Sequence, residues 1–528
     1  MRNRTNLTSP VSNLPLPTSL APLRAAGIAA MLLLGGCATK LDQLPSEPQV
    51  EVPQAWQTTQ AQKPNAMESA EESPEVKQTI TEESVQSGWL TKFDDPELEG
   101  YVQTALQNNP DLWSSAAQLK SAIEQVTVTG ASLWPNVQAG VQSTRRDTET
   151  DGITTEVRTV SGTLDIAWEA DVWGKLTQRK KATALSAQAQ AELYNAAELS
   201  LVANVTRAWF NLMTNKLQLD LAEQRLESFQ NTAKLIEENY ERGLRSALDV
   251  YLSRTDVQRQ IADLSDSKFN YISSLRAFKT LLGEYPTLSM SFDAKLPTLS
   301  DPIPAGLPAE LLTRRPDIKA SQFQYESQVA SAKAANRDRY PSINFSGSIG
   351  DSRDSFNQLF ENNNLITTLV AGVAQPIFQA GALKSREEQA YYQAEQAYAN
   401  LVKTTLNAFE EVENSLSREA ILRRQHTAIK EAVRLAQGGL DLALDRYQTG
   451  IENYTTVLQS QRSLFDSMRT EINIRNALLQ NRIGIHLALG GDFATEESRS
   501  ENQLLPGPIA AETTSDLAEE PESASETE

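Results

Sequence analysis

Few side chains in this sequence could carry out catalysis. The chain holds one cysteine, Cys37, and two histidines, His426 and His486, which are 60 residues apart (486 minus 426). It contains neither GxxxxGK followed by Ser or Thr, nor GxSxG, nor HExxH. One cysteine forms no disulfide within the chain, and metal clusters have almost no ligands. We therefore expect a protein that is not an enzyme and that needs no cofactor and no metal.

Cys37 lies where a lipid could be attached. An apolar run over residues 25–34 follows three arginines; it is short for a membrane span but suits the core of a signal peptide. The Leu-Gly-Gly-Cys sequence ending at Cys37 looks like a bacterial lipobox, whose cysteine is acylated, with palmitate among its chains. Ala38 follows instead of Asp, which by the sorting rule for such lipoproteins implies delivery to the outer membrane. The alternative is a plain secretory signal that contains a cysteine.

The composition places limits on partners and on the folded region. A net charge of -20 argues against nucleic acid, because phosphate binding relies on clustered Lys and Arg. Both ends of the chain lack the large apolar residues that build a core. We predict a lipoprotein signal peptide over 1–36, a lipid-anchored flexible tether over 37–88 and an acidic disordered tail over 493–528.

An internal repeat organises the rest of the chain. The matched landmarks are Pro110 and Pro316, Pro135 and Pro341, and Gly243 and Gly450. The displacement is 206 residues for the two proline pairs (316 minus 110, 341 minus 135) and 207 for the glycines (450 minus 243). One period at three landmarks predicts two copies of one structural unit. The predicted boundaries are a first repeat over 89–286, a linker over 287–308 and a second repeat over 309–492.

Each repeat contains the alternation of a β-hairpin. Val137, Ala139 and Val141 alternate with polar or small residues, and a second alternating run follows. The polar stretch between them, residues 145–156, contains Gly152 and is predicted to be the hairpin loop. Such strands fit a membrane sheet with lipid outside and water inside, although an ordinary half-buried sheet is the alternative. The predicted hairpins cover 136–168 and 342–377.

Long segments without Gly or Pro predict long helices. As one helix, residues 175–242 would be about 100 Å long at 1.5 Å per residue. Apolar residues over 201–240 follow alternating steps of four and three, and residues 257–282 show the same rhythm. A sustained period of 3.5 residues indicates coiled-coil packing. Gly243 and Gly450 would end the helices at the far tips of two hairpins.

Four amphipathic strands cannot close a barrel by themselves. An open sheet edge in lipid leaves backbone groups unpaired at several kcal/mol each, so the barrel must be shared between subunits. Two copies would give eight strands, a barrel filled by its own side chains, whereas three would give twelve and room for water. A conducting function would favour three copies, so the predicted fold class is an α+β membrane protein with a trimeric 12-stranded β-barrel, four strands per chain (three times four).

Together these motifs resemble the TolC-like outer-membrane efflux channels, in the lipoprotein branch that serves resistance-nodulation-division multidrug pumps. The resemblance covers nearly all of residues 89–492. It is carried by Trp89, Phe93 and Asp95-Pro96, the signatures starting at Asn109 and Arg315, Trp134-Pro135 and Tyr340-Pro341, Asp171-Val172-Trp173-Gly174, Pro376-Ile377-Phe378 and the two tip glycines.

The resemblance implies a homotrimer in the outer membrane whose barrel continues as a 12-helix periplasmic α-barrel. It implies the channel of a tripartite efflux system, which gives passive exit to drugs or other small molecules. The implied partners are a periplasmic adaptor, also called a membrane fusion protein, and an inner-membrane resistance-nodulation-division pump.

The same resemblance assigns roles at the hairpin tips. The implied adaptor-docking residues are Arg242, Gly243, Ser246, Ala247, Leu248, Asp249, Thr449, Gly450, Ile451 and Val457. Acidic side chains constrict the family's entrance, and the candidates for this periplasmic gate are Glu452 and Asp249, although related tips often carry Asp where this chain has Glu452. Three like carboxylates brought together by symmetry would repel one another and attract cations. Glu452 could instead be a solvated loop charge.

Two alternatives stay open at this point. A lipid-anchored coiled-coil structural or adaptor protein without a channel would explain Cys37 and the heptads, but not the four strands. It would also leave Trp134 and Trp168, expected near the membrane interfaces, to pack in a core. A channel for secreted proteins or metal ions is the other possibility; the chain has only six Met, so a Met-rich metal signal is absent.

Overall fold

The computed structural model describes a large part of the chain. The described residues are Pro45, Val52, Trp56, 88–299, 311–359, 365–491 and 493. The chain divides into two compact units, Met1–Ser46 and Glu47–Glu528, and every helix and strand below belongs to the second. The predicted signal peptide, Cys37, nearly all of the predicted tether, part of the linker and the acidic tail after residue 493 lie outside the described residues.

The elements confirm the internal repeat. In chain order they are η3 (Thr91–Phe93), α4 (Pro96–Asn108), α5 (Pro110–Gly130), η4 (Ala131–Leu133), β1 (Asn136–Thr150), β2 (Ile153–Ala170), α6 (Lys175–Glu241), α7 (Ala247–Leu281), α8 (Leu311–Arg314), α9 (Pro316–Arg337), β3 (Ser342–Arg353), η6 (Phe356–Gln358), β4 (Ile366–Ala374), α10 (Ala382–Gln448) and α11 (Tyr454–Ala488). Helices α6 and α10 each have 67 residues, and α7 and α11 each have 35, so one half copies the other. No described helix is both long and apolar enough to cross a membrane.

The four strands form one antiparallel sheet in the order β1-β2-β3-β4. The predicted loop over 145–156 is wrong, because β1 and β2 stay paired as far as Thr150 and Ile153. Asp151 and Gly152, with φ of 51° and 77°, form the whole turn. Two successive residues with positive φ match the twist of a tight hairpin, and Asp-Gly is a favoured pair there, so no wider loop is required.

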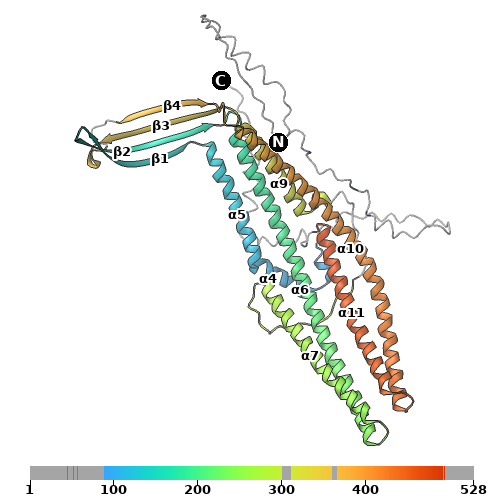
Figure 1. Ribbon diagram of the computed structural model, residues 1–528. Helices are drawn as coiled ribbons and strands as arrows, with labels where there is room; N and C mark the ends of the chain where they lie inside the picture. Colours follow the sequence, from blue (N-terminus) through green and yellow to red (C-terminus); the bar gives the residue numbers. More distant parts are fainter. Residues whose placement is uncertain are drawn as a thin grey trace, which may run out of the picture. The chain divides into compact units, whose positions relative to one another are not determined.

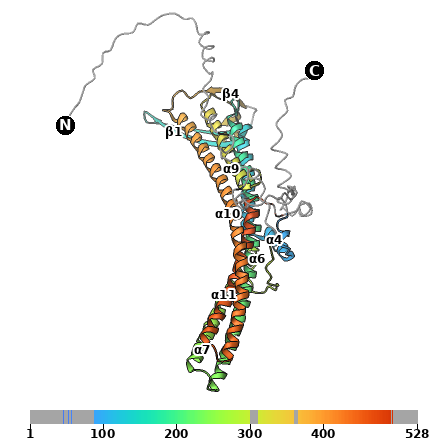
Figure 2. The same cartoon turned by 90° about the vertical axis from the view of Figure 1, so that its right-hand side faces the viewer.

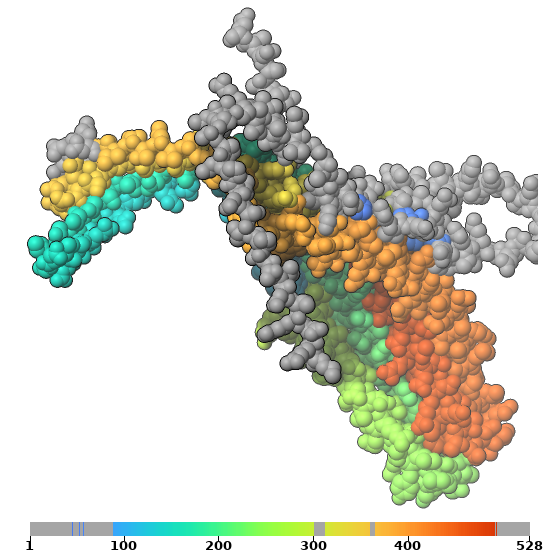
Figure 3. Space-filling view, turned by 45° about the horizontal axis from the view of Figure 1, so that its top comes forward, coloured from blue at the N-terminus to red at the C-terminus, as the bar shows by residue number. Residues whose placement is uncertain are grey.

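The sheet has no core of its own in a single chain (Figures 1 and 3). Every residue of β1 and β4 is exposed. Exposed apolar side chains such as Val137 and Leu164 share one face, as the alternation predicted. Trp168 stacks on Phe345 with 5.6 Å between ring centroids, and its indole N–H donates to the carbonyl of Leu133 at 2.9 Å. A half-buried sheet of an ordinary globular core would cover one face, and this sheet does not.

The main core forms where α4, α6 and α7 meet. Its largest buried side chains include Trp89, Phe93, Leu98, Trp209, Phe210 and Phe278. One oxygen of Asp95 accepts from the backbone N–H of Leu98 (3.1 Å) and so caps α4. The other oxygen accepts from the indole N–H of Trp209 at 2.7 Å. One carboxylate therefore starts a helix and satisfies the polar atom of a buried tryptophan.

The coiled-coil register is confirmed along α6 and only partly along α7. On α6 the buried members of the predicted series are Leu201, Val205, Leu212, Leu219, Phe229, Ala233 and Ile236. On α7, Leu275 and Phe278 are buried, but Ile261, closer to the tip, is exposed. There α7 turns Asp256 and Gln260 inward instead. In its tip half this hairpin thus buries polar side chains of α7 as well as apolar ones such as Ile236 of α6.

The repeated signatures at Asn109 and Arg315 hydrogen-bond to the C-terminal ends of α7 and α11. Asn109 caps α5 by accepting from the N–H of Asp111 (3.0 Å), and its side-chain amide donates to the carbonyl of Leu281 (2.9 Å). At the matching position, the Arg315 guanidinium donates to the carbonyl of Ala488 at 3.1 Å. Leu281 and Ala488 are the last residues of α7 and α11. Each signature therefore satisfies a helix carbonyl that has no partner within its own helix.

One histidine lies inside the core. His486, 2% exposed, stacks on Trp89 with 5.5 Å between ring centroids. Burial first, and the nearby charges of Lys92 and Arg482 second, lower the pKa of His486 from 6.5 to about 3. The imidazole is therefore neutral in the folded protein near neutral pH.

This burial makes stability depend on acid. Below pH 6.5 the His486 imidazole binds a proton in the unfolded chain but not in the folded chain. The stability of the folded state therefore falls as pH decreases from about 6.5 towards about 3. At pH 5 the loss amounts to about 2 kcal/mol per chain. We expect His486→Phe, which can keep the stack on Trp89, to remove most of this loss in thermal melts followed by circular dichroism. His426→Phe is the control and should keep the original acid sensitivity; equal pH dependence of the two variants would contradict the assignment.

Candidate functional site: an unfinished sheet and two hairpin tips

The sheet ends in two unpaired edges. Strand β1 pairs only with β2, and β4 only with β3, so each presents a row of free backbone N–H and C=O groups. In hydrocarbon each such group costs several kcal/mol. Sheets from neighbouring copies must therefore pair along β1 and β4 before these strands can lie in a bilayer.

The helix hairpins end in glycine turns at the opposite ends of α6 and α10 from the sheet (Figures 1 and 2). Gly243 and Gly450 have φ of 73° and 83°, a region that favours glycine. The N–H of Gly243 donates to the carbonyl of Tyr240 at 2.8 Å, and that of Gly450 donates to Tyr447 at 3.1 Å. These bonds close the two helices at the predicted landmarks.

Most of the predicted docking residues lie on the surface of the tips. The exposed ones are Arg242, Gly243, Ser246, Ala247, Leu248, Thr449, Gly450 and Ile451. Leu248 and Ile451 are apolar yet 64% and 73% exposed in the single chain. Asp249 is half-buried in the first turn of α7, where its N–H donates to the Ser246 hydroxyl at 3.3 Å. Val457 differs, because it is fully buried beside Tyr447 and Tyr454, so it supports the tip from within.

The two gate candidates lie on different tips. Glu452 is half-buried and has partners in its own tip: Arg446 at 3.9 Å and the Thr456 hydroxyl, which donates at 3.2 Å. Among the described residues, no hydrogen bond or ion pair joins Glu452 to Asp249. Within one chain, these carboxylates therefore do not form a single acidic site.

Arg245, which the sequence did not single out, joins the two tips. Its guanidinium lies over the ring of Tyr447, 4.1 Å from the centroid, and donates to the Tyr447 carbonyl. Tyr447 lies in the last turn of α10, whereas Arg245 lies in the turn between α6 and α7. A stacked guanidinium combines cation–π attraction with a charge-assisted hydrogen bond.

A buried charged contact ties the hairpins together behind the tips. Asp256 of α7, 3% exposed, accepts from the Arg462 guanidinium (2.7 Å) and from the Tyr454 hydroxyl (3.3 Å) of α11. Burial and the neighbouring Asp256 raise the pKa of Tyr454, so its hydroxyl stays protonated and donates. We call these three residues the interhairpin network. One turn further, Gln461 donates to the Thr232 hydroxyl of α6 at 2.8 Å.

The sequence carried a signal for this network that only becomes clear with the fold. Ser253, Asp256 and Gln260 follow steps of three and four residues, the spacing of a buried helix stripe. Because these residues are polar, the pattern alone also fits a solvated helix face. Asp256 is buried whereas the Arg462 side chain is 43% exposed, so removing Arg462 would leave the buried carboxylate without its closest cation.

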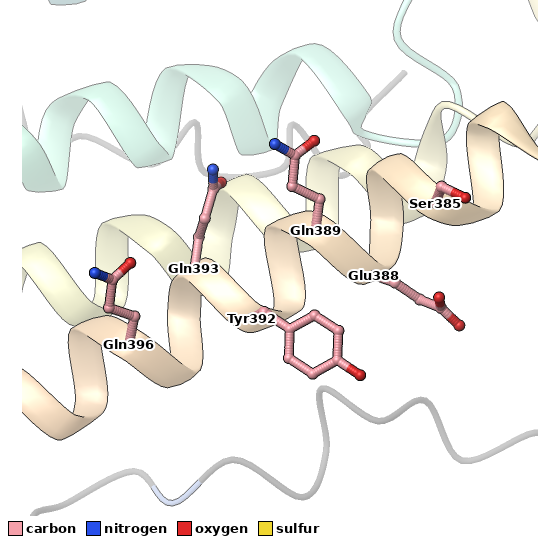
Figure 4. Close-up of a pocket in the computed structure, with 6 residues that line it drawn as sticks. All are labelled: Ser385, Glu388, Gln389, Tyr392, Gln393 and Gln396. Atoms are coloured by element: carbon pink, nitrogen blue, oxygen red, sulfur yellow. The ribbon is translucent and has the colours of Figure 1, made fainter.

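A hollow lies on α10, away from the hairpin tips. The hollow in Figure 4 is lined by six residues of α10 alone: Ser385, Glu388, Gln389, Tyr392, Gln393 and Gln396. In Figure 4 the side chains of Gln389, Gln393 and Gln396 project to one side of the helix, whereas those of Glu388 and Tyr392 project to the other. No group of three or more His, Cys, Asp or Glu in the described part of the chain is arranged to hold a metal ion.

Comparison with known proteins identifies this architecture. The family described as "Outer membrane efflux protein" matches residues 101–284 and 307–491, one match in each repeat. The chain belongs to this family.

Individual relatives of the chain are also proteins of efflux systems. The chain is 28% identical over 484 residues to the probable efflux pump outer membrane protein TtgC of Pseudomonas putida, covering 89% of this chain and 96% of that protein. It is 27% identical over 476 residues to the cation efflux system protein CusC of Escherichia coli, covering 90% and 100%. A solved CusC structure superposes with a TM-score of 0.72 at 25% identity, covering 84% of this chain and 98% of that one.

The chain is thus one subunit of an outer-membrane efflux channel that extends into the periplasm. The predicted fold class, a shared β-barrel continued by an α-barrel in a trimer, is confirmed. A coiled-coil or adaptor protein without a channel is excluded as an alternative. The relatives are channel and efflux proteins rather than enzymes.

The interhairpin network should restrain the channel entrance. We expect Asp256→Asn, which removes the charge that holds Arg462, to loosen α7 from α11 and raise single-channel conductance in planar bilayers at least severalfold. Asp266→Asn, an exposed carboxylate on the same helix, is the matched control and should conduct as the unaltered protein does. Equal conductance of both variants would show that the network does not limit opening.

Proposed function

We propose that the trimer gives passive exit to drugs or other small molecules, which an inner-membrane resistance-nodulation-division pump delivers through a periplasmic adaptor. The family and the named relatives support an efflux role. Relatives named as outer membrane proteins of an antibiotic efflux pump and of a toluene efflux pump suggest the cargo class. The chain itself catalyses no reaction in this proposal. The observation that carries it is a pair of hairpin tips that expose apolar side chains at the periplasmic end of a channel subunit.

The adaptor would dock on the tips. Leu248 and Ile451 are apolar side chains that are exposed to water at the tips of the α6–α7 and α10–α11 hairpins. Exposed apolar side chains rimmed by polar ones suit a protein contact. Docking there would pull directly on Arg245 and the interhairpin network, which join the two hairpins. An adaptor that binds the separated hairpins more tightly than the joined ones would shift the channel towards opening. Glu452 and Asp249 would then set the charge of the entrance.

The remaining boundaries form part of the proposal. The predicted signal peptide 1–36 would be removed, and Cys37 would carry the lipid that anchors the tether 37–88. Two repeats, 89–286 and 309–492, would form the channel wall on either side of the linker 287–308, and 493–528 would be an acidic tail.

A tip variant tests the docking surface. We expect the double variant Leu248→Ser with Ile451→Ser to lose at least tenfold in drug resistance when it replaces the intact gene product in cells. Its trimer mass in detergent and its conductance in planar bilayers should not change, because neither side chain lies in a buried core.

The control for this experiment is Leu288→Ser, an exposed leucine in the segment after α7, which should leave resistance intact. Full resistance in the tip variant would refute docking at these residues. A protein that runs as a water-soluble monomer without conductance would refute the channel itself.

Acylation of Cys37 has a direct test. Labelled palmitate should be incorporated into the intact chain and not into Cys37→Ser, because no other cysteine is present. Label in both proteins would place the lipid elsewhere.

A further inference from the structure

Positive charge gathers where the sheet meets the helices. The segments 169–181, 333–340 and 382–388 hold nine Lys or Arg and five Asp or Glu, a local net charge of +4 (9 minus 5) in a chain of net charge -20. The three segments lie together, because Arg179 pairs with Asp338 at 2.8 Å and Arg339 pairs with Glu387 at 2.6 Å. We call this region the basic junction.

Internal ion pairs use only part of this charge. Lys175 pairs with Glu169 and Asp338, and Lys384 lies 3.9 Å from Glu388. Four further cations are exposed and have no ion pair with any residue that the structure describes. They are Lys180, Lys181, Lys333 and Arg386.

The position of these cations on their helices is unfavourable without an anion. Helices α6 and α10 have no acidic residue in their first turns, whereas α5 and α9 begin with Asp111 and Asp317. The N-terminus of a helix carries partial positive charge, so nearby Lys and Arg destabilise it. Lys180 and Arg386 lie within the first two turns of α6 and α10. At α6 the chain itself supplies an anion, because the Asp171 carboxylate accepts from the backbone N–H groups of Leu176 (2.8 Å) and Thr177 (2.7 Å). At α10 the N-cap residue is Gly381, which has no side chain to do this, so a bound anion would lower the repulsion there.

Exposed aromatic side chains lie within the basic junction and beside it, next to the strands. Trp134, Trp173 and Tyr340 are exposed beside the strands, and Phe378 is 86% exposed before α10. The Trp173 indole N–H donates to the carbonyl of Pro341 at 2.7 Å, which fixes the ring in place. Tryptophan and tyrosine concentrate at the interface between acyl chains and headgroups. From strand to helix, the surface thus runs apolar, aromatic and basic, which is the order of acyl chain, interface and phosphate in one leaflet.

We propose that the basic junction binds the phosphate groups of anionic phospholipids in the periplasmic leaflet of the outer membrane. The leaflet follows from the chain's direction, because α6 and α10 leave the sheet at this junction and run into the periplasm. The charge of the basic junction is complementary to anionic headgroups. Three copies in the trimer would form a ring of such sites around the channel. This role goes beyond conduction, because it fixes the depth of the channel in the membrane.

Native mass spectrometry of the purified full-length trimer tests the proposal. With equimolar phosphatidylglycerol and phosphatidylethanolamine, we expect the trimer to retain at least fivefold more phosphatidylglycerol. The double variant Lys180→Gln with Lys181→Gln should lose most of this preference. The matched control is Lys403→Gln with Lys430→Gln, two exposed lysines further along α10, which should keep it.

A second variant keeps the test independent of one helix. Arg386→Gln changes the other repeat and should lower the preference about twofold. No preference in the unaltered trimer, or full preference in both variants, would overturn the proposal. Retention of lipopolysaccharide in place of phosphatidylglycerol would also overturn it, because that lipid belongs to the outer leaflet.

Discussion

The whole architecture depends on backbone hydrogen bonds at two strand edges. A sheet of four strands with both faces exposed and both edges unpaired is not stable alone in water or in lipid. Closure with two further copies satisfies every edge and leaves a cylinder wide enough for water. Oligomerisation is therefore not an addition to a finished fold, because the membrane part of the fold exists only in the trimer.

The periplasmic part solves a different problem, which is how to keep very long helices in register. Each repeat pairs a 67-residue helix with a 35-residue return helix, and a capping signature satisfies the end of the return helix. Asn109 does this in the first repeat and Arg315 in the second. The aromatic core around Trp209 lies at the same level. These contacts fix the position at which each 35-residue helix ends along its 67-residue partner.

Both polar and apolar contacts hold the tips. Arg245 on Tyr447 and Asp256 with Arg462 join the hairpins beside a buried apolar cluster that includes Ile236, Tyr447 and Val457. Charged contacts are directional and can be exchanged for water or for a partner's groups, whereas a packed apolar seam separates only at a large cost. An entrance that must open and close is better served by such contacts. At the other end of the same helices, the unpaired cations of the basic junction face the membrane in the proposal above.

The sequence alone determined everything that depends on local period. Alternation defined the strands, steps of three and four defined the helices, and Gly243 and Gly450 marked the turns, because these signals need no knowledge of neighbours. The tertiary structure decided the rest. The pairing of Thr150 with Ile153 extends the β1–β2 ladder through a stretch whose polarity had predicted a loop. Val457 is buried, although the family resemblance predicted that it contacts the adaptor. Asp256 became a buried anchor only because α11 brings Arg462 and Tyr454 to it, and no local pattern encodes which helix lies alongside.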